Sequence, residues 1–271
     1  METLSLPQHV TAEEIGLHRA RIVIEPCYPG YGTTLGNALR RVLLSSLPGA
    51  AVTAVKISKV DHEFSTLPGV KEDVVDLLLN IKQIRCKVFS AEPVNVHLKV
   101  TGEKDVTAGD IETTSDVEVI NKDLHLATLT DKKASLEIVF TVEQGRGYIT
   151  VETREKEKLD IGTIAVDAIY TPVKRVGYAV ENVRVGQMTN YDKLTLDVET
   201  DGSINPLEAV KQASTILIDH FMVIKGDDSK ATSVVEDSVV EPKVVVEEKV
   251  AEDELESRPT PKKRGRPKKE I

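Results

Sequence analysis

Residues 30–49 read GYGTTLGNALRRVLLSSLPG, in which a glycine-rich loop leads into a run of apolar residues at helical spacing. Thr33 or Thr34 can cap the start of a helix, and Pro48-Gly49 ends it. Positions three and four apart share one face of a helix, so the stretch predicts an amphipathic helix that runs to about Leu47. Its apolar face consists of Leu35, Ala38, Leu39, Val42, Leu43 and Leu47.

The segments on either side of this helix favour strands and one further helix. Arg21–Glu25 predicts a short strand before it and Ala51–Val60 a strand after it. Lys71–Gln83 predicts a second, strongly apolar helix. From there to about Val151 the apolar residues recur at every second position, which is typical of strands, and Gln144–Gly147 predicts a hairpin turn. The middle of the chain is therefore expected to be β-rich.

A third helix is expected after two further strands, Tyr178–Val185 and Lys193–Thr200. Asn205 is a good N-cap and Pro206 suits the first helical position, so the helix should run from there to about Lys225. One stripe of this helix consists of Leu207, Val210, Ser214, Leu217, Phe221 and Ile224.

The formal net charge of −9 is unevenly distributed along the 271 residues. Residues 1–225 carry −7, residues 226–257 carry −8 and residues 258–271 carry +6. This asymmetry indicates a folded body, an acidic linker without regular structure and a basic tip that would bind nucleic acid. Aromatic residues make up only 4% of the chain, which disfavours a sugar-binding cleft or a base-stacking platform.

The cysteines and the hydropathy pattern point to the cytoplasm. Two cysteines, Cys27 and Cys86, make neither a disulfide framework nor a zinc site by themselves, and we expect buried thiols in a reducing compartment. No apolar run approaches the roughly 18 residues that a membrane span needs. The first residues also lack the pattern of a signal peptide.

The glycines of the loop allow two interpretations. Gly30, Gly32 and Gly36 follow a strand and open a helix, as in a dinucleotide-binding turn, but their spacing departs from that fingerprint. A dinucleotide fold also needs a parallel sheet, whereas the later strands are joined by hairpin turns. The alternative is that Gly36 allows close backbone packing in the first turn of the helix. Arg40 and Arg41 point away from the apolar face and are candidates for contact with a partner.

Residues 30–49 resemble the signature helix of the bacterial RNA polymerase α subunit. The resemblance covers roughly residues 10–225. It continues in order through His62–Thr66, Gly69–Asp73, Leu77–Lys82, Gly145–Tyr148, Val166–Val173 and Asn205–Ala209.

The resemblance implies an α+β fold with two subdomains. Residues 1–48 and 176–225 would form a dimerisation subdomain with two long helices packed on an antiparallel sheet. Residues 49–175 would form an inserted, β-rich subdomain. From the charge pattern, and not from the resemblance, an acidic disordered linker, 226–257, and a basic tail, 258–271, are expected to follow.

The resemblance also implies protein partners. The chain would form a homodimer and scaffold the β and β′ subunits, with omega and sigma joining in the holoenzyme, so it would be nucleoid-associated. Arg41 and Leu44 match positions that contact β, with Arg40 as a weaker neighbour, and Lys82 and Val166 match positions associated with β′ assembly. The first and last helices would form the dimer interface through Leu35, Leu39, Val42, Leu43, Leu207, Val210, Leu217 and Phe221.

No catalytic role is expected for this chain. The polymerase active site needs clustered aspartates that hold Mg²⁺, and the sequence contains no such triplet. We therefore expect no cofactor, no metal ligand and no catalytic residue here; the Mg²⁺ would lie on another subunit. The chain would count as an enzyme only as a subunit of a nucleotidyltransferase complex.

The basic tail departs from the family pattern. The family continues into a helical DNA-binding domain, for which the 46 residues after Lys225 are too few. Residues 262–269, KKRGRPKK, instead look like an AT-hook, a motif that enters the narrow, electronegative minor groove of A/T-rich DNA. The residues expected to bind DNA are Arg264, Gly265, Arg266, Pro267 and Lys268.

Other interpretations of the chain remain open at this point. The tail could bind any polyanion, or it could fold back on the acidic linker. The whole protein could be a DNA-architectural protein that acts mainly through its tail, or a nucleotide-dependent enzyme that uses the glycine loop.

Overall fold

The computed structural model of the protein describes residues 4–154, 160 and 162–226. Apart from Gly226, the predicted acidic linker and basic tail lie outside the described residues. The described chain is mixed helix and antiparallel sheet, which confirms the predicted α+β class. No helix in this part of the chain is long and apolar enough to cross a membrane.

One sheet combines strands from both ends of the described chain. Its order is β1-β2-β15-β14, and every pair is antiparallel. The strands are β1 (His9–Gly16), β2 (Arg19–Cys27), β14 (Val173–Val185) and β15 (Met188–Thr200). Because β2 pairs with β15, residues about 170 positions apart become neighbours, as with Ile22 and Leu196.

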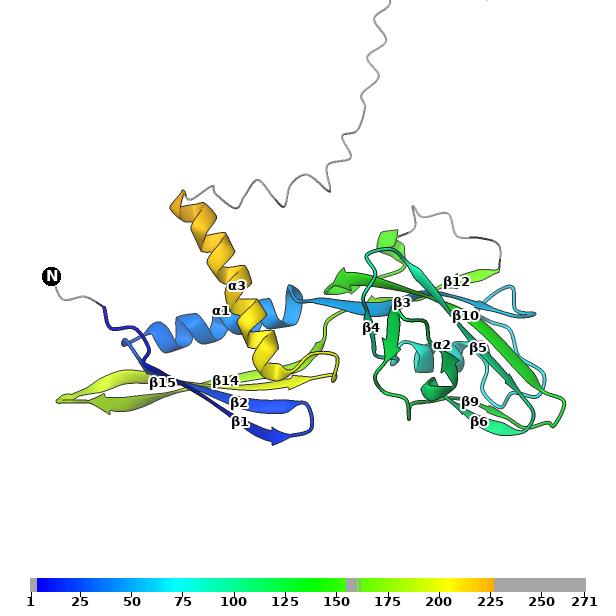
Figure 1. The fold of residues 1–271 in the computed structure, drawn as a ribbon, viewed down its shortest axis with the longest axis horizontal. Helices are drawn as coiled ribbons and strands as arrows, with labels where there is room; N and C mark the ends of the chain where they lie inside the picture. The colour runs from blue at the N-terminus through cyan, green and yellow to red at the C-terminus, as the bar shows by residue number, and fades with distance from the viewer. Residues whose placement is uncertain (1–3, 155–159, 161, 227–271) are drawn as a thin grey trace, which may run out of the picture. The chain divides into compact units, whose positions relative to one another are not determined.

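Two helices pack on this sheet (Figure 1). Helix α1 (Tyr31–Ser45) contacts β14 and β15, and helix α3 (Pro206–Lys225) contacts α1, β2 and β15. Their common core includes Leu39 and Leu43 from α1 together with Ala209 and Ala213 from α3. The small alanine side chains allow the two helices to approach closely where they cross.

The residues between α1 and β14 form a second, larger sheet with its own core. Its order is β7-β5-β10-β3-β4-β8, and β12 also pairs with β3. Helix α2 (Val74–Ile81) buries Val74, Leu77 and Ile81 in this core. The strands are β3 (Pro48–Ile57), β4 (Cys86–Val88), β5 (Val94–Thr101), β7 (Ile111–Glu112), β8 (Val117–Val119), β10 (Ser135–Arg146) and β12 (Thr163–Ala165).

Two small antiparallel pairs complete the described strands. The first joins β6 (Lys104–Thr107) to β9 (His125–Leu129), and the second joins β11 (Tyr148–Ile149) to β13 (Ala168–Ile169). Short 3₁₀ turns lie at Ala108–Asp110 and Glu152–Arg154.

The predicted N-cap of α3 is confirmed, but that of α1 is wrong. The Asn205 side chain accepts a hydrogen bond from the backbone N–H of Leu207, 2.9 Å away. Helix α1 begins two residues earlier than Thr33, after Gly30, whose φ of 83° places it in the left-handed region. Neither Thr33 nor Thr34 caps the helix, because the cap comes from a distant residue, as described below.

Other local predictions are corrected by longer-range pairing. The expected hairpin at Gln144–Gly147 is wrong: β10 continues to Arg146 alongside β3, and β11 pairs with β13 instead. Helix α2 begins at Val74 rather than Lys71 because the Asp73 carboxylate accepts the N–H of Asp76 and caps it there. Strand β1, whose residues are all exposed, was not predicted.

The close-packing interpretation of the glycine loop is confirmed. A Cβ atom on Gly36 would lie 2.7 Å from Cδ2 of Tyr178 and 2.9 Å from Cδ1 of Leu194, both on the sheet beneath α1. All strand pairs among the described residues are antiparallel, which is incompatible with a dinucleotide fold. The predicted burial of both cysteine thiols is also confirmed.

Candidate functional site

The exposed side of α1 carries the first group of predicted contact residues. Arg40, Arg41 and Leu44 are all exposed, Leu44 by 36%. Neither guanidinium forms an ion pair with any residue that the structure describes. The last turn beneath them is fixed, since Thr171 donates its hydroxyl to the Leu44 carbonyl at 3.3 Å. Within the described chain, this face therefore offers two cations without an ionic partner beside an apolar side chain.

Helix α1 is anchored at its other end by a carboxylate from the sheet. Asp192 on β15 is 7% exposed, and its Oδ2 accepts the backbone N–H groups of Gly30 at 2.9 Å and of Gly32 at 3.0 Å. These N–H groups have no partner within the helix, and a negative charge is favourable at a helix N-terminus. Asp192 therefore fixes the position of α1, and with it the exposed arginines.

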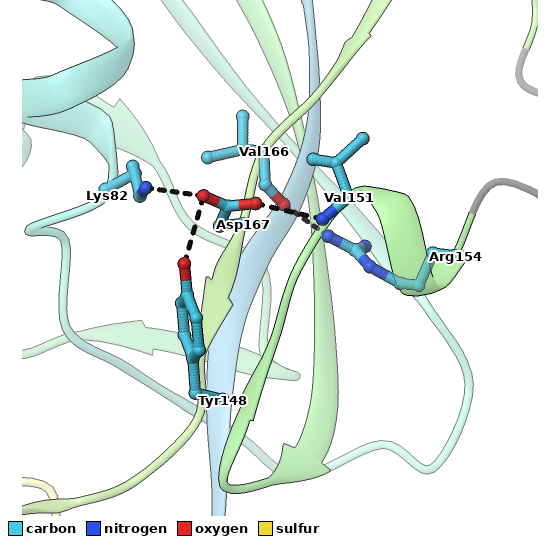
Figure 2. Close-up of polar contacts among 6 residues, drawn as sticks. All are labelled: Lys82, Tyr148, Val151, Arg154, Val166 and Asp167. Carbon is cyan, nitrogen blue, oxygen red and sulfur yellow. Dashed lines mark hydrogen bonds and ion pairs between the residues drawn. The ribbon is translucent and has the colours of Figure 1, made fainter.

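Lys82, from the second group of predicted contact residues, lies beside Asp167 together with Tyr148 and Val151 (Figure 2). Lys82, the C-cap of α2, forms an ion pair with Oδ2 of Asp167 at 2.9 Å. The Tyr148 hydroxyl donates to the same oxygen at 3.2 Å, and the backbone N–H of Val151 donates to Oδ1 at 2.9 Å. One carboxylate thus joins α2, β11 and the residues after β11.

These donors stabilise the ionised form of Asp167. The hydrogen bond from Lys82, together with that from the Val151 backbone, holds the pKa of Asp167 below its ordinary value. Because the Lys82 and Asp167 side chains are 26% and 28% exposed, the pair is better shielded from solvent than a typical surface ion pair.

The side chain of Val166 is too deeply buried for direct contact with a partner. Its side chain is 3% exposed and belongs to the core of the large sheet. Its backbone N–H donates to the Thr53 carbonyl at 2.9 Å, and its carbonyl accepts the guanidinium of Arg154. The structure therefore brings Lys82 together with Asp167 and Tyr148, whereas the side chain of Val166 faces inward.

Sequence reasoning missed Asp167, Tyr148 and Asp192 as site residues. Asp167 and Tyr148 lie inside the blocks that carry the family resemblance, and this was the available signal. Nothing in the sequence near Asp192 indicated that it would cap a helix 160 residues away.

The predicted dimer residues fall into three groups by exposure. Leu39 and Leu43 are buried in the chain's own core, and Leu35, Val42, Leu207, Val210 and Leu217 are partly buried against it. Phe221 is 62% exposed. It belongs to the second half of α3, which extends beyond its crossing with α1 (Figure 1). The apolar side chains exposed there are Ile218, Phe221, Met222, Val223 and Ile224.

The predicted DNA-binding residues form the last group. Arg264, Gly265, Arg266, Pro267 and Lys268 lie outside the described residues. Within residues 4–154, 160 and 162–226, no three His, Cys, Asp or Glu side chains gather closely enough to hold a metal ion.

Comparisons with known proteins show which proteins the chain is similar to. Residues 55–171 match a family model described as the RNA polymerase Rpb3/RpoA insert domain. The chain is 55% identical over 201 residues to the DNA-directed RNA polymerase subunit alpha of Clostridium botulinum strains Hall, Langeland and Okra. The match covers 74% of this chain and 64% of each relative, so the chain spans just under two thirds of the length of the curated relatives it matches. Over these 201 residues the chain is thus similar to bacterial RNA polymerase alpha subunits, and its residues 55–171 match the insert domain of such subunits.

Proposed function

We propose that this chain is a non-catalytic subunit of DNA-directed RNA polymerase, which homodimerises and provides the platform on which β and β′ assemble. The chemistry of nucleotide transfer, with its Mg²⁺, belongs to another subunit of the complex. The chain would act in the cytoplasm, at the nucleoid, as part of that complex with omega and sigma.

The observation that carries the proposal is the exposed face of α1. Arg40 and Arg41 have no acidic partner among the described residues, and Leu44 lies exposed one turn along. Arginine pairs with carboxylates in a bidentate geometry and is enriched among the residues that dominate interface energies. This face suits the β subunit, which would supply carboxylates for the arginines and an apolar pocket for Leu44.

The second half of α3 supports homodimerisation. Its exposed apolar residues extend around the helix, and burial of one large apolar side chain contributes about 1.5–3 kcal/mol. A second copy of the same chain offers the same surface, and two-fold, self-complementary contacts are the commonest way in which proteins associate. The buried Leu39 and Leu43 would support this interface from below rather than enter it.

The surface around Lys82 is the proposed contact with β′. Tyr148 is 57% exposed and Leu79, one turn before Lys82 on α2, is 53% exposed. An aromatic ring, an apolar side chain and a partly buried lysine together make a mixed surface of the kind found at protein interfaces.

Co-expression tests this function. The full chain, carrying a purification tag, is produced with the β and β′ subunits of the same organism and purified. The proposal expects a complex that contains two copies of the chain and one copy of each large subunit. Recovery of the chain without either large subunit would refute the assembly role.

We further propose that the basic tail contacts A/T-rich upstream DNA. The sequence supports this through Arg264-Gly265-Arg266-Pro267, flanked by lysines that can neutralise phosphates. The full chain should bind an A/T-rich duplex more tightly than a G/C-rich one at the same salt concentration. Replacement of both Arg264 and Arg266 by alanine should remove this preference. Equal affinity of the unmodified chain for both duplexes would refute minor-groove recognition.

A further inference from the structure

Val166 presents a difficulty for the proposed contact with β′. A side chain that is 3% exposed and packed in a core cannot touch a partner. Any effect of Val166 on assembly must therefore pass through a neighbouring residue. The next residue along the chain is Asp167, whose carboxylate lies among Lys82, Tyr148 and Val151 (Figure 2).

Asp167 joins three groups that come from separate parts of the chain. Lys82 is the C-cap of α2, Tyr148 begins β11, and Val151 follows β11. Three hydrogen bonds of 2.9, 3.2 and 2.9 Å to one carboxylate set the orientation of the Lys82 stem, the Tyr148 ring and the intervening backbone. Bonds to an ionised acceptor are among the stronger hydrogen bonds in proteins.

The arrangement leaves hydrogen-bonding capacity for a partner. A lysine ammonium has three donors, and Nζ of Lys82 uses one of them on Asp167 among the described residues. The Tyr148 ring is fixed by its hydroxyl but remains 57% exposed. A partner surface that supplies carbonyl or carboxylate oxygens beside an apolar group would complement this site.

We propose that Asp167 is a positioning residue for the contact with β′, which orients Lys82 and Tyr148 toward that subunit, and that the buried Val166 acts through it. This inference rests on the assembly function proposed above. Val166 places Asp167 by packing into the core, and Asp167 in turn places the two residues that meet the partner.

The test is the co-expression experiment with Asp167→Ala in the full chain. We expect this variant to keep β while at least tenfold less β′ is recovered, because only the Lys82 surface has changed. General loss of the fold would reduce both subunits, so selective loss of β′ is a readout that a merely structural role would not produce. Asp105→Asn is the matched control, since Asp105 is exposed and its side chain has no hydrogen bond or ion pair among the described residues.

Two more variants distinguish a specific loss of β′ from a loss caused by misfolding. The side chain introduced by Asp167→Asn can still accept the Val151 N–H but cannot neutralise Lys82. The loss of β′ should therefore be intermediate, and the variant should remain folded with only a small fall in its melting temperature. The double variant Lys82→Ala with Asp167→Ala should lose no more β′ than the worse single variant, because the two residues act as one unit.

The outcomes separate this inference from the function on which it rests. Wild-type recovery of β′ by both Asp167 variants would overturn the role of Asp167, and so would equal loss of β and β′ in both. If the unmodified chain recovers neither subunit, the assembly function fails, and the role of Asp167 fails with it.

Discussion

The carboxylate of Asp192, on the last strand of the small sheet, accepts the backbone N–H of Gly32 in the first turn of α1 at 3.0 Å. The same oxygen accepts the N–H of Gly30, so one acidic side chain caps a helix whose first turn, at Gly32, lies 160 residues earlier in the chain. Glycine is needed at position 32 because a Cβ there would lie 2.9 Å from the Cβ of Asp192. The glycine motif is therefore explained by a helix cap and close packing, without a nucleotide.

Replacement of Asp192 by alanine should destabilise the protein by about 2–4 kcal/mol, because two N–H groups lose a charged acceptor in a buried place. Asp192→Asn, which keeps one acceptor oxygen without the charge, should cost less. Urea unfolding of both variants and of Asp105→Asn checks this order. A free energy of unfolding for Asp192→Ala within about 0.5 kcal/mol of the unmodified chain would contradict the capping role.

Gly36→Ala should also be destabilising, by about 1–3 kcal/mol, because its Cβ would overlap Tyr178 and Leu194 and push α1 away from the sheet. Gly177→Ala on β14 is the matched control, since no atom lies within 4 Å of the added Cβ. Thermal unfolding of the two variants makes the comparison. Similar melting temperatures for both would show that α1 does not need its close approach at Gly36.

Local and distant interactions explain which parts of the fold could be predicted. The Asn205 cap of α3 was predictable because donor and acceptor are two residues apart. The cap of α1 was not, because Asp192 and Gly32 meet only after β15 has joined the sheet. The predicted hairpin at Gln144–Gly147 was wrong because distant strands compete with it. Strand β10 pairs with β3 as far as Arg146, and β11 pairs with β13.

In the candidate site, too, local sequence predicts some features, whereas others depend on contacts between distant segments. The exposed Arg40 and Arg41 follow from helical periodicity, because the apolar face fixes where the other residues point. The burial of Val166 and the gathering of Lys82, Tyr148 and Asp167 depend on contacts between segments about 20 to 85 residues apart. No pattern within a short window carries that information.

Arg41→Ala should weaken binding of β at least tenfold, or about 1.4 kcal/mol, while the oligomeric state of the isolated chain stays unchanged. Its guanidinium is exposed and makes no ion pair within the described chain, so its removal costs little stability. A titration of tagged chain with purified β measures the affinity. Arg175→Ala, also exposed, is the control on β14, and equal affinities for the two variants would count against the α1 face as the β contact.

The stability contributed by Asp167 should depend on pH only in acid. The Lys82 hydrogen bond lowers the pKa of Asp167 in the folded state, so its contribution is complete above the ordinary aspartate pKa of about 3.9. That contribution is lost as the pH falls through the lowered pKa, because the carboxyl then takes up a proton in both states.

The difference in unfolding free energy between the unmodified chain and Asp167→Asn should therefore be constant from about pH 7 to pH 5. Below about pH 4 this difference should fall towards zero. Urea unfolding at each pH gives the two curves. A difference that closes near neutral pH, or that persists unchanged in strong acid, would show that Asp167 is not held ionised by Lys82.

Assembly of the proposed platform requires α3 to meet a second copy of the chain, since no described residue covers the apolar side chains of its second half. The most direct test is the molar mass of the purified full chain at micromolar concentration, measured by light scattering after size exclusion. We predict twice the chain mass of 29.7 kDa. A mass of 29.7 kDa across the micromolar range would contradict the dimeric platform.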